Sequence, residues 1–105
     1  MPDQTPDKTV SESQYREFTT SLSSAIRRRR ISVGFNLRLM SERTGMSLGH
    51  ISQIELGQSM PSMEALYRLC VALELTMAQL FSLVEVQADL IRIEHAALNQ
   101  KHEVV

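Results

Sequence analysis

Residues 36–57 read NLRLMSERTGMSLGHISQIELG, and this stretch decides the fold of the chain. Asn36 and Ser47 are residue types that cap the N-terminus of a helix, and an apolar pattern with helical spacing follows each of them. Gly45 and Gly57 come after the two patterns, and glycine suits the left-handed conformation that ends a helix. The stretch therefore predicts two short helices that a tight turn sets at a large angle.

Helical patterns continue on both sides of this pair. A first helix is predicted to begin at Ser11 or Ser13 and to end by Gly34, because apolar residues recur there at three- and four-residue spacing. Its apolar stripe consists of Tyr15, Phe18, Leu22, Ala25 and Ile26. Ser62 is the predicted cap of a fourth helix, whose core face consists of Leu66, Leu69, Cys70 and Leu73.

The spacing of Thr76 and Gln79 is that of a capping box and predicts a fifth helix from Met77 to about Val84. A separate amphipathic helix is predicted beyond it, with an apolar stripe at Val86, Leu90, Ile93 and Ala97. No segment has the alternation typical of a strand. We therefore expect an all-α fold, a five-helix domain with an extended first helix and an added C-terminal amphipathic helix.

Composition limits the class of protein. The chain of 105 residues is 43% hydrophobic, which suffices for one core. We expect a flexible arm at residues 1–10, one domain at 11–84, and a C-terminal helix and tail at 85–105. No apolar run has the length of a membrane span and the first residues lack a signal peptide, so we expect a cytoplasmic protein without a membrane partner. The single cysteine, Cys70, is expected to be a buried hydrophobe.

Charge is unevenly distributed along the chain. The net charge is only -1, yet residues 25–50 carry six arginines against one acid. A basic segment that overlaps a pair of short helices favours a nucleic-acid partner over an ordinary solvated surface. The geometry of the pair agrees with this interpretation, because the second helix of such a pair can enter the major groove of DNA.

Residues 26–75 closely resemble the Cro/CI-type helix-turn-helix family, also called the xenobiotic-response-element family, and in particular its bacterial members. The features that carry the resemblance are Arg27 to Arg30, the Ser-Glu-Arg-Thr-Gly turn at 41–45, Ile51-Ser52-Gln53-Ile54-Glu55 followed by Gly57, and Pro61, Ser62, Leu66 and Leu69. The resemblance covers about residues 22–84. It implies a third helix, about Leu48 to Leu56, that lies in the major groove, and a second helix that crosses the phosphate backbone.

The outward face of this third helix supplies the candidates for base contact, because Ile51 and Ile54 are expected to face the core. Gln53 is the strongest candidate, since its amide both donates and accepts and so matches N6 and N7 of adenine. The other candidates are Ser52, Leu48, which can touch a thymine methyl, and Gly49, which permits close approach. Part of the specificity is expected to come from DNA shape.

The candidates for phosphate contact are Arg38, Arg43, Ser47, His50, Arg27, Arg28 and Arg30. Consecutive helical positions are about 100° apart, so the four adjacent arginines cannot all face DNA. Glu55 is expected to pair with an arginine rather than to read a base.

The resemblance implies a sequence-specific transcriptional regulator. We expect a repressor that binds an inverted-repeat operator in double-stranded DNA as a homodimer, without a cofactor or a metal. Dimerisation is assigned to the stripe at Val86, Leu90, Ile93 and Ala97, and the alternative is that this stripe folds back on Tyr15 and Phe18. Apolar residues replace expected polar ones at Leu39, Leu56 and Met60. They are either ordinary exposed residues or a contact with a protein such as an anti-repressor, a toxin or RNA polymerase.

The alternative function is that of an antitoxin, which binds DNA and also a partner toxin through its C-terminal segment. An enzyme is not expected. His50, His95 and His102 lack neighbours with the spacing of metal ligands, and no arrangement of nucleophile and base is present.

Overall fold

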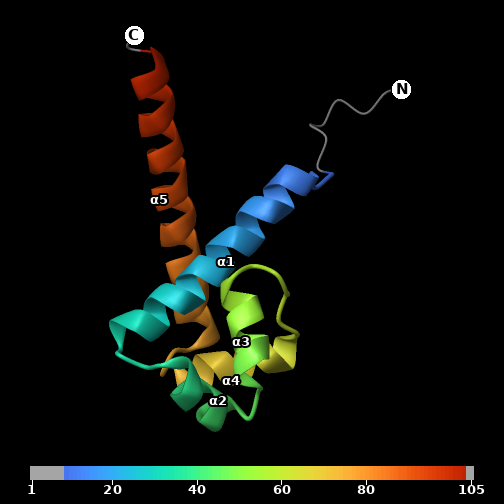
Figure 1. Ribbon diagram of the computed structural model, residues 1–105. Coiled ribbons are helices and arrows are strands. Elements are labelled where there is room, and N and C mark those ends of the chain that lie inside the picture. The colour runs from blue at the N-terminus through green and yellow to red at the C-terminus, as the bar shows by residue number, and fades with distance from the viewer. Residues whose placement is uncertain (1–8, 104–105) are drawn as a thin grey trace, which may run out of the picture.

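The computed structural model describes residues 9–103, with side chains described for residues 9–100. Within that range it contains five helices and no strand, so the predicted all-α class is confirmed. The helices are α1 (Glu12–Ser32), α2 (Leu37–Thr44), α3 (Leu48–Glu55), α4 (Met63–Ala72) and α5 (Met77–Glu103). Figure 1 shows α2, α3 and α4 gathered below α1, while α5 crosses α1 and rises beyond it. Most of the predicted arm at residues 1–10 lies outside the described residues.

Side-chain caps fix where the helices begin. Ser11 and Gln14 form a capping box on α1, with Gln14 N donating to Ser11 Oγ at 3.1 Å and Ser11 N donating to Gln14 Oε1 at 2.9 Å. Thr76 and Gln79 form a second box at the start of α5. The remaining helices are capped by Asn36, Ser47 and Ser62, each of which accepts from the N–H three residues later. These caps agree with the sequence because capping is a local interaction.

One apolar core joins the helices. Its largest fully buried side chains are Ile26, Met40, Ile51, Ile54, Leu69, Leu73 and Leu80. Full burial of such a side chain contributes roughly 1.5–3 kcal/mol to the free energy of unfolding. Because two of these residues lie on the eight-residue helix α3, its inward face is anchored and its outward face has a fixed orientation.

Arginine side chains bind the carbonyls at the ends of the short helices. The last carbonyls of a helix have no donor within the helix. Arg68 of α4 donates from Nη1 to Thr44 O at the end of α2 at 2.9 Å, and Arg43 of α2 donates from Nη1 to Ala72 O at the end of α4 at 3.3 Å. The two C-termini are thus bound reciprocally. Two further carbonyls accept from arginines, Leu73 O from Arg29 and Phe35 O from Arg30.

α5 is one helix of 27 residues where the sequence predicted two. Between Met77 and Glu103 there is no glycine or proline to interrupt it. After Val84 the apolar residues move to another face of the helix, because the surroundings of the helix change there. Leu80 and Val84 are buried in the core, whereas residues 92–100 are exposed. No single helix in the described range is long and apolar enough to cross a membrane; α4 and much of α5 meet that criterion only as a pair bent by 93°.

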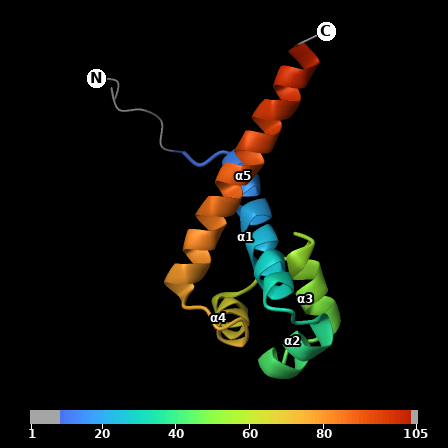
Figure 2. The same cartoon turned by 90° about the vertical axis from the view of Figure 1, so that its left-hand side faces the viewer.

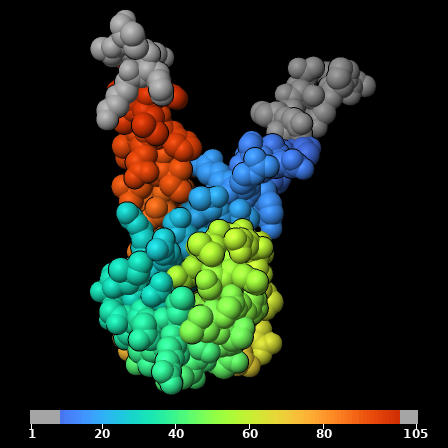
Figure 3. Space-filling view, viewed as in Figure 1, coloured from blue at the N-terminus to red at the C-terminus, as the bar shows by residue number. Residues whose placement is uncertain are grey.

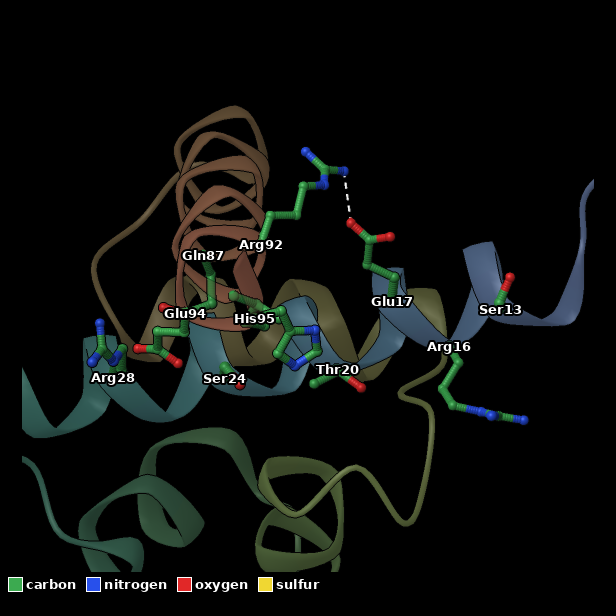
Figure 4. A pocket seen from close by; sticks show the side chains of 11 residues that line it. Ser13, Arg16, Glu17, Thr20, Ser24, Arg28, Gln87, Arg92, Glu94 and His95 are labelled. Carbon is green, nitrogen blue, oxygen red and sulfur yellow. Dashed lines mark ion pairs between the residues drawn. The ribbon is translucent and has the colours of Figure 1, made fainter. Parts of the chain in front are cut away.

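α1 and α5 cross and then diverge, which leaves the notch between two arms seen in Figure 3. Figure 2 shows that α1 lies between α5 and α3. At the crossing, Arg92 Nη2 lies 2.7 Å from Glu17 Oε1, as a charge contact rather than an aligned hydrogen bond. The same two residues line an open groove of about 640 Å³ between α1 and α5, together with Arg28, Glu94 and His95 (Figure 4).

Candidate nucleic-acid interface

One exposed face of α3 carries the four residues assigned to base contact. Residues four apart on a helix share a face, so Leu48 lies beside Ser52 and Gly49 lies beside Gln53. Leu48, Gly49 and Gln53 are exposed, and Ser52 is half-buried. The structure therefore brings these four residues together on the surface opposite the core.

The turn before α3 is held by two hydroxyl groups whose role the sequence analysis missed. Gly45 ends α2 with a φ of 73°. Ser41 Oγ donates to Met46 O at 2.6 Å. Thr44 Oγ1 donates to Met40 O at 2.7 Å and accepts from Met46 N at 3.1 Å. A threonine directly before the terminating glycine was the available signal. These bonds fix the orientation of α3 relative to α2.

The side chains of Gln53 and Ser52 have no hydrogen-bond partner among the described residues. The Gln53 amide consequently has both its donor and its acceptor free on an exposed surface. Such an amide can bind an adjacent donor and acceptor at once, which is the pattern that adenine presents in the major groove.

Arg38 is an exposed arginine on α2 without a strong ion-pair partner. Its side chain is 85% exposed, and its ion pair with Glu42 at 3.8 Å is worth little, because the glutamate is itself 66% exposed. Arg27 is also exposed. Ser47 Oγ accepts from His50 N at 3.1 Å, which leaves its hydroxyl proton free to donate, and the His50 side chain is half-buried. These four residues stay candidates for phosphate contact.

Arg30 has a structural role instead. It donates from Nε to Glu55 Oε2 at 2.7 Å and from Nη2 to Glu55 Oε1 at 2.9 Å, a bidentate pair whose side chains are only 13% and 4% exposed. The pair ties α1 to the end of α3. We therefore remove Arg30 from the phosphate candidates, and the expectation that Glu55 pairs with an arginine is confirmed.

Two further arginines point away from the exposed face of α3. Arg28 lines the groove between α1 and α5, where Figure 4 shows it beside Glu94. Arg43 donates to Ala72 O, lies 4.0 Å from Glu74 Oε1, and stacks over the Phe35 ring at 4.4 Å. The guanidinium of Arg43 therefore has internal partners, whereas Arg28 is exposed and has no hydrogen-bond or ion-pair partner among the described residues. Three of the six arginines at residues 25–50, namely Arg29, Arg30 and Arg43, thus bind groups within the fold.

Exposed apolar residues lie on several elements. Of the three residues noted in the sequence, Leu39 is half-buried, whereas Leu56 and Met60 are exposed. α4 also carries a strip of exposed residues at four-residue spacing that was not predicted, formed by Met63, Tyr67 and Val71. The signal for it was present, since these positions lie opposite the apolar core face of that helix.

The apolar stripe of α5 at Val86, Leu90, Ile93 and Ala97 is exposed. α5 packs against α1 through a different face, which includes Val84 and Ala88. Tyr15 and Phe18 are exposed as well. The alternative in which the stripe folds back onto these two aromatic residues is therefore not what the structure shows.

The described histidine, cysteine and acidic side chains form no metal-binding cluster. Within the described side chains, no three His, Cys, Asp or Glu residues are grouped closely enough to hold a metal ion, and His102 lies outside that range. Cys70 is buried, and burial raises the pKa of its thiol. A thiol with a raised pKa is a poor nucleophile, so Cys70 is a core residue that contacts Met77 Sδ at 3.4 Å.

Two short helices at a fixed angle, the second with a solvent-facing polar surface, define a helix-turn-helix DNA-binding domain. The chain belongs to the helix-turn-helix family of the Cro/CI type, whose family model matches residues 26–80, more than half of the chain. The family consists of DNA-binding transcriptional regulators rather than enzymes.

Two curated relatives are the transcriptional regulator ClgR of Mycobacterium tuberculosis, strains CDC 1551 / Oshkosh and H37Rv. Each is 39% identical over 57 residues, which cover 54% of this chain and 51% of the relative. The match thus spans about half the length of these relatives.

Solved structures of relatives support the fold. A crystal structure of the clp gene regulator ClgR from Corynebacterium glutamicum has a TM-score of 0.73 at 26% identity, covering 78% of this chain and 87% of that one. A second structure of that regulator has a TM-score of 0.64 at 28% identity, covering 68% of this chain and 91% of that one.

Proposed function

We propose that this chain is a sequence-specific transcriptional regulator that acts as a repressor in the bacterial cytoplasm and binds its operator as a homodimer. The observation that carries the proposal is the exposed face of α3, where the Gln53 amide has no partner among the described residues. The helix beneath it is anchored by buried Ile51 and Ile54 and by the Arg30–Glu55 pair. A rigid helix with free polar groups is suited to base readout in the major groove.

Base contacts are assigned to α3 alone, and phosphate contacts to α1, α2 and the first turn of α3. Gln53 reads adenine through its amide, Ser52 contacts a neighbouring base edge, and Leu48 touches a thymine methyl. Arg38 on α2 neutralises a phosphate, and Arg27, Ser47 and His50 supply the remaining backbone contacts. Because Leu48 and Gly49 offer no side-chain hydrogen bonds to base edges, part of the specificity comes from DNA shape.

Dimerisation is assigned to the exposed stripe of α5. The stripe lies on a face that α1 does not cover, and an apolar face of this length is expected to be buried in an assembly. A twofold dimer presents two copies of α3 symmetrically, so the operator is an inverted repeat with half-site centres about 10 bp apart, or a multiple of that spacing. Occupation of such a site excludes RNA polymerase and represses transcription.

Selection of bound fragments from random and genomic DNA with the purified chain tests the proposal. Enrichment of one inverted-repeat sequence is expected. Promoter fragments of clp genes belong in the same experiment, because the solved relatives are described as clp gene regulators. Retention of fragments without any common sequence would contradict the proposed function.

A further inference from the structure

The four glycines of the chain fall into two groups. Gly34, Gly45 and Gly57 have φ values of 78°, 73° and 75°, in the left-handed region that favours glycine. Gly49 has no such conformation, because it is the second residue of α3 and has a negative, helical φ. Backbone conformation therefore explains three glycines and leaves Gly49 unexplained.

Steric crowding does not explain Gly49 either. A Cβ atom built at this position would meet no other atom within 4 Å. Alanine would therefore fit, and it would stabilise a helix of only eight residues, because glycine is unfavourable within a helix. The folded chain thus gains nothing from glycine at position 49.

The position of Gly49 points to a contact outside the chain. It lies in the first turn of α3, on the face that carries Gln53 four residues later and Ser52 three residues later. We propose that Gly49 is a specificity-determining residue, at which the backbone of α3 lies against base edges in the major groove at a distance that a methyl group would prevent. This inference rests on the proposed function and adds a steric element to the hydrogen-bonding role of Gln53.

Replacement by alanine has opposite effects on folding and on binding if this inference is right. Gly49→Ala should raise the Tm by a few degrees in a thermal melt followed by circular dichroism. It should weaken binding to the selected operator by about ten- to a hundredfold and leave binding to random DNA unchanged. Repeating the selection with Gly49→Ala should change the preferred base at one or two adjacent positions of each half-site.

Gly34→Ala is the matched control. Its Cβ would also meet no atom within 4 Å, but the φ of Gly34 is 78°. This variant should therefore lower the Tm and bind the operator with unchanged affinity at temperatures at which it is folded.

Three outcomes would overturn the inference about Gly49: a stabilised Gly49→Ala variant with parental affinity and base preference, equal losses on operator and random DNA, or a lowered Tm. If the unaltered chain enriches no sequence at all, the proposed function fails instead, and the two failures are distinguishable.

Discussion

The arginines of this chain are of two kinds, those with an internal partner and those without a strong one. The planar, five-donor group of arginine can bind a carbonyl or a carboxylate in a fixed geometry, and Arg29, Arg30, Arg43 and Arg68 do so in the structure. Arg38 has no comparable partner and is largely exposed. Residues of the second kind have all their donors free for phosphates, so we expect fewer phosphate contacts than the number of arginines suggests.

Separate replacement of Arg38 and of Gln53 should distinguish the contribution of phosphate contacts to DNA affinity from that of base contacts. Arg38→Ala should weaken binding to every DNA sequence and reduce the slope of log affinity against log salt by about one unit. Gln53→Ala should cost about 1–3 kcal/mol on the operator and nothing on random DNA, because an amide–base contact is sequence-dependent. Fluorescence titrations at several salt concentrations measure both effects. Equal losses for Gln53→Ala on both DNAs would exclude a base-reading role.

Removal of the buried acid at position 55 should destabilise the fold strongly. Glu55→Ala leaves the guanidinium of Arg30 without its carboxylate at a position with a side chain only 13% exposed, and we expect a loss of about 3–5 kcal/mol. Replacing both residues, as Arg30→Met with Glu55→Leu, should recover most of this loss, because no unpaired charge remains. Urea unfolding measures the free energies. A loss below about 1 kcal/mol for Glu55→Ala would show that the pair is unimportant for stability.

The residues on the exposed face of α3 could be predicted from the sequence, because Ile51 and Ile54 define its buried side by helical periodicity. The roles of the arginines could not be predicted in the same way. Arg30 binds a residue 25 positions away and Arg68 one 24 positions away, so their partners depend on tertiary packing. The sequence predicted that Glu55 pairs with an arginine but not which arginine, and it indicated no partner for Arg68.

At the scale of the helix, boundaries set by capping residues were predictable and the length of α5 was not. Asn36, Ser47 and Ser62 cap the helices that they were expected to cap, because capping is local. The apolar pattern along α5 changes phase where the helix leaves the core, and the prediction interpreted this change as a break. A helix that leaves the core and a helix that ends produce the same shift of the apolar pattern in the sequence.

The contact between α2 and α4 gives a prediction at this scale. Arg68→Ala removes the donor to Thr44 O at the end of α2 and should cost about 0.5–1.5 kcal/mol, because that carbonyl loses its partner. Arg68 also pairs with Glu64 on its own helix, a pair that is largely exposed. Glu64→Ala is therefore the matched control and should cost less than about 0.5 kcal/mol. Equal losses in urea unfolding would mean that the bond to Thr44 contributes no stability.

At the scale of the whole molecule, α5 has two faces with different environments. One face packs on α1 near Val84 and Ala88 and is tied by the Glu17–Arg92 contact. The other face carries the exposed stripe, in which Leu90 is 37% exposed and Ile93 is 64% exposed. Because the first face is already in use, the second is free to bind another molecule without rearrangement of the domain.

Two acidic substitutions on the stripe should separate dimerisation from folding. Leu90→Asp with Ile93→Asp introduces two charges on a surface that is exposed in the single chain, so the helical circular dichroism signal should persist. The same charges would be buried in a dimer made through this stripe, at a large cost in free energy. We expect a monomer by light scattering, and a fall in operator affinity of orders of magnitude, since one α3 alone makes half of the contacts.

Ala96→Asp with Asn99→Asp is the matched control, because it adds the same two charges to exposed positions on another face of α5. This control should remain dimeric and keep its operator affinity. If the Leu90 and Ile93 variant stayed dimeric, the assignment of the interface to the stripe would be wrong. If that variant unfolded, the stripe would be needed for the folding of the single chain, and the assignment of the stripe to a dimer interface would again be wrong. Loss of the dimer in both variants would show that net charge on α5 controls assembly, whichever face carries it.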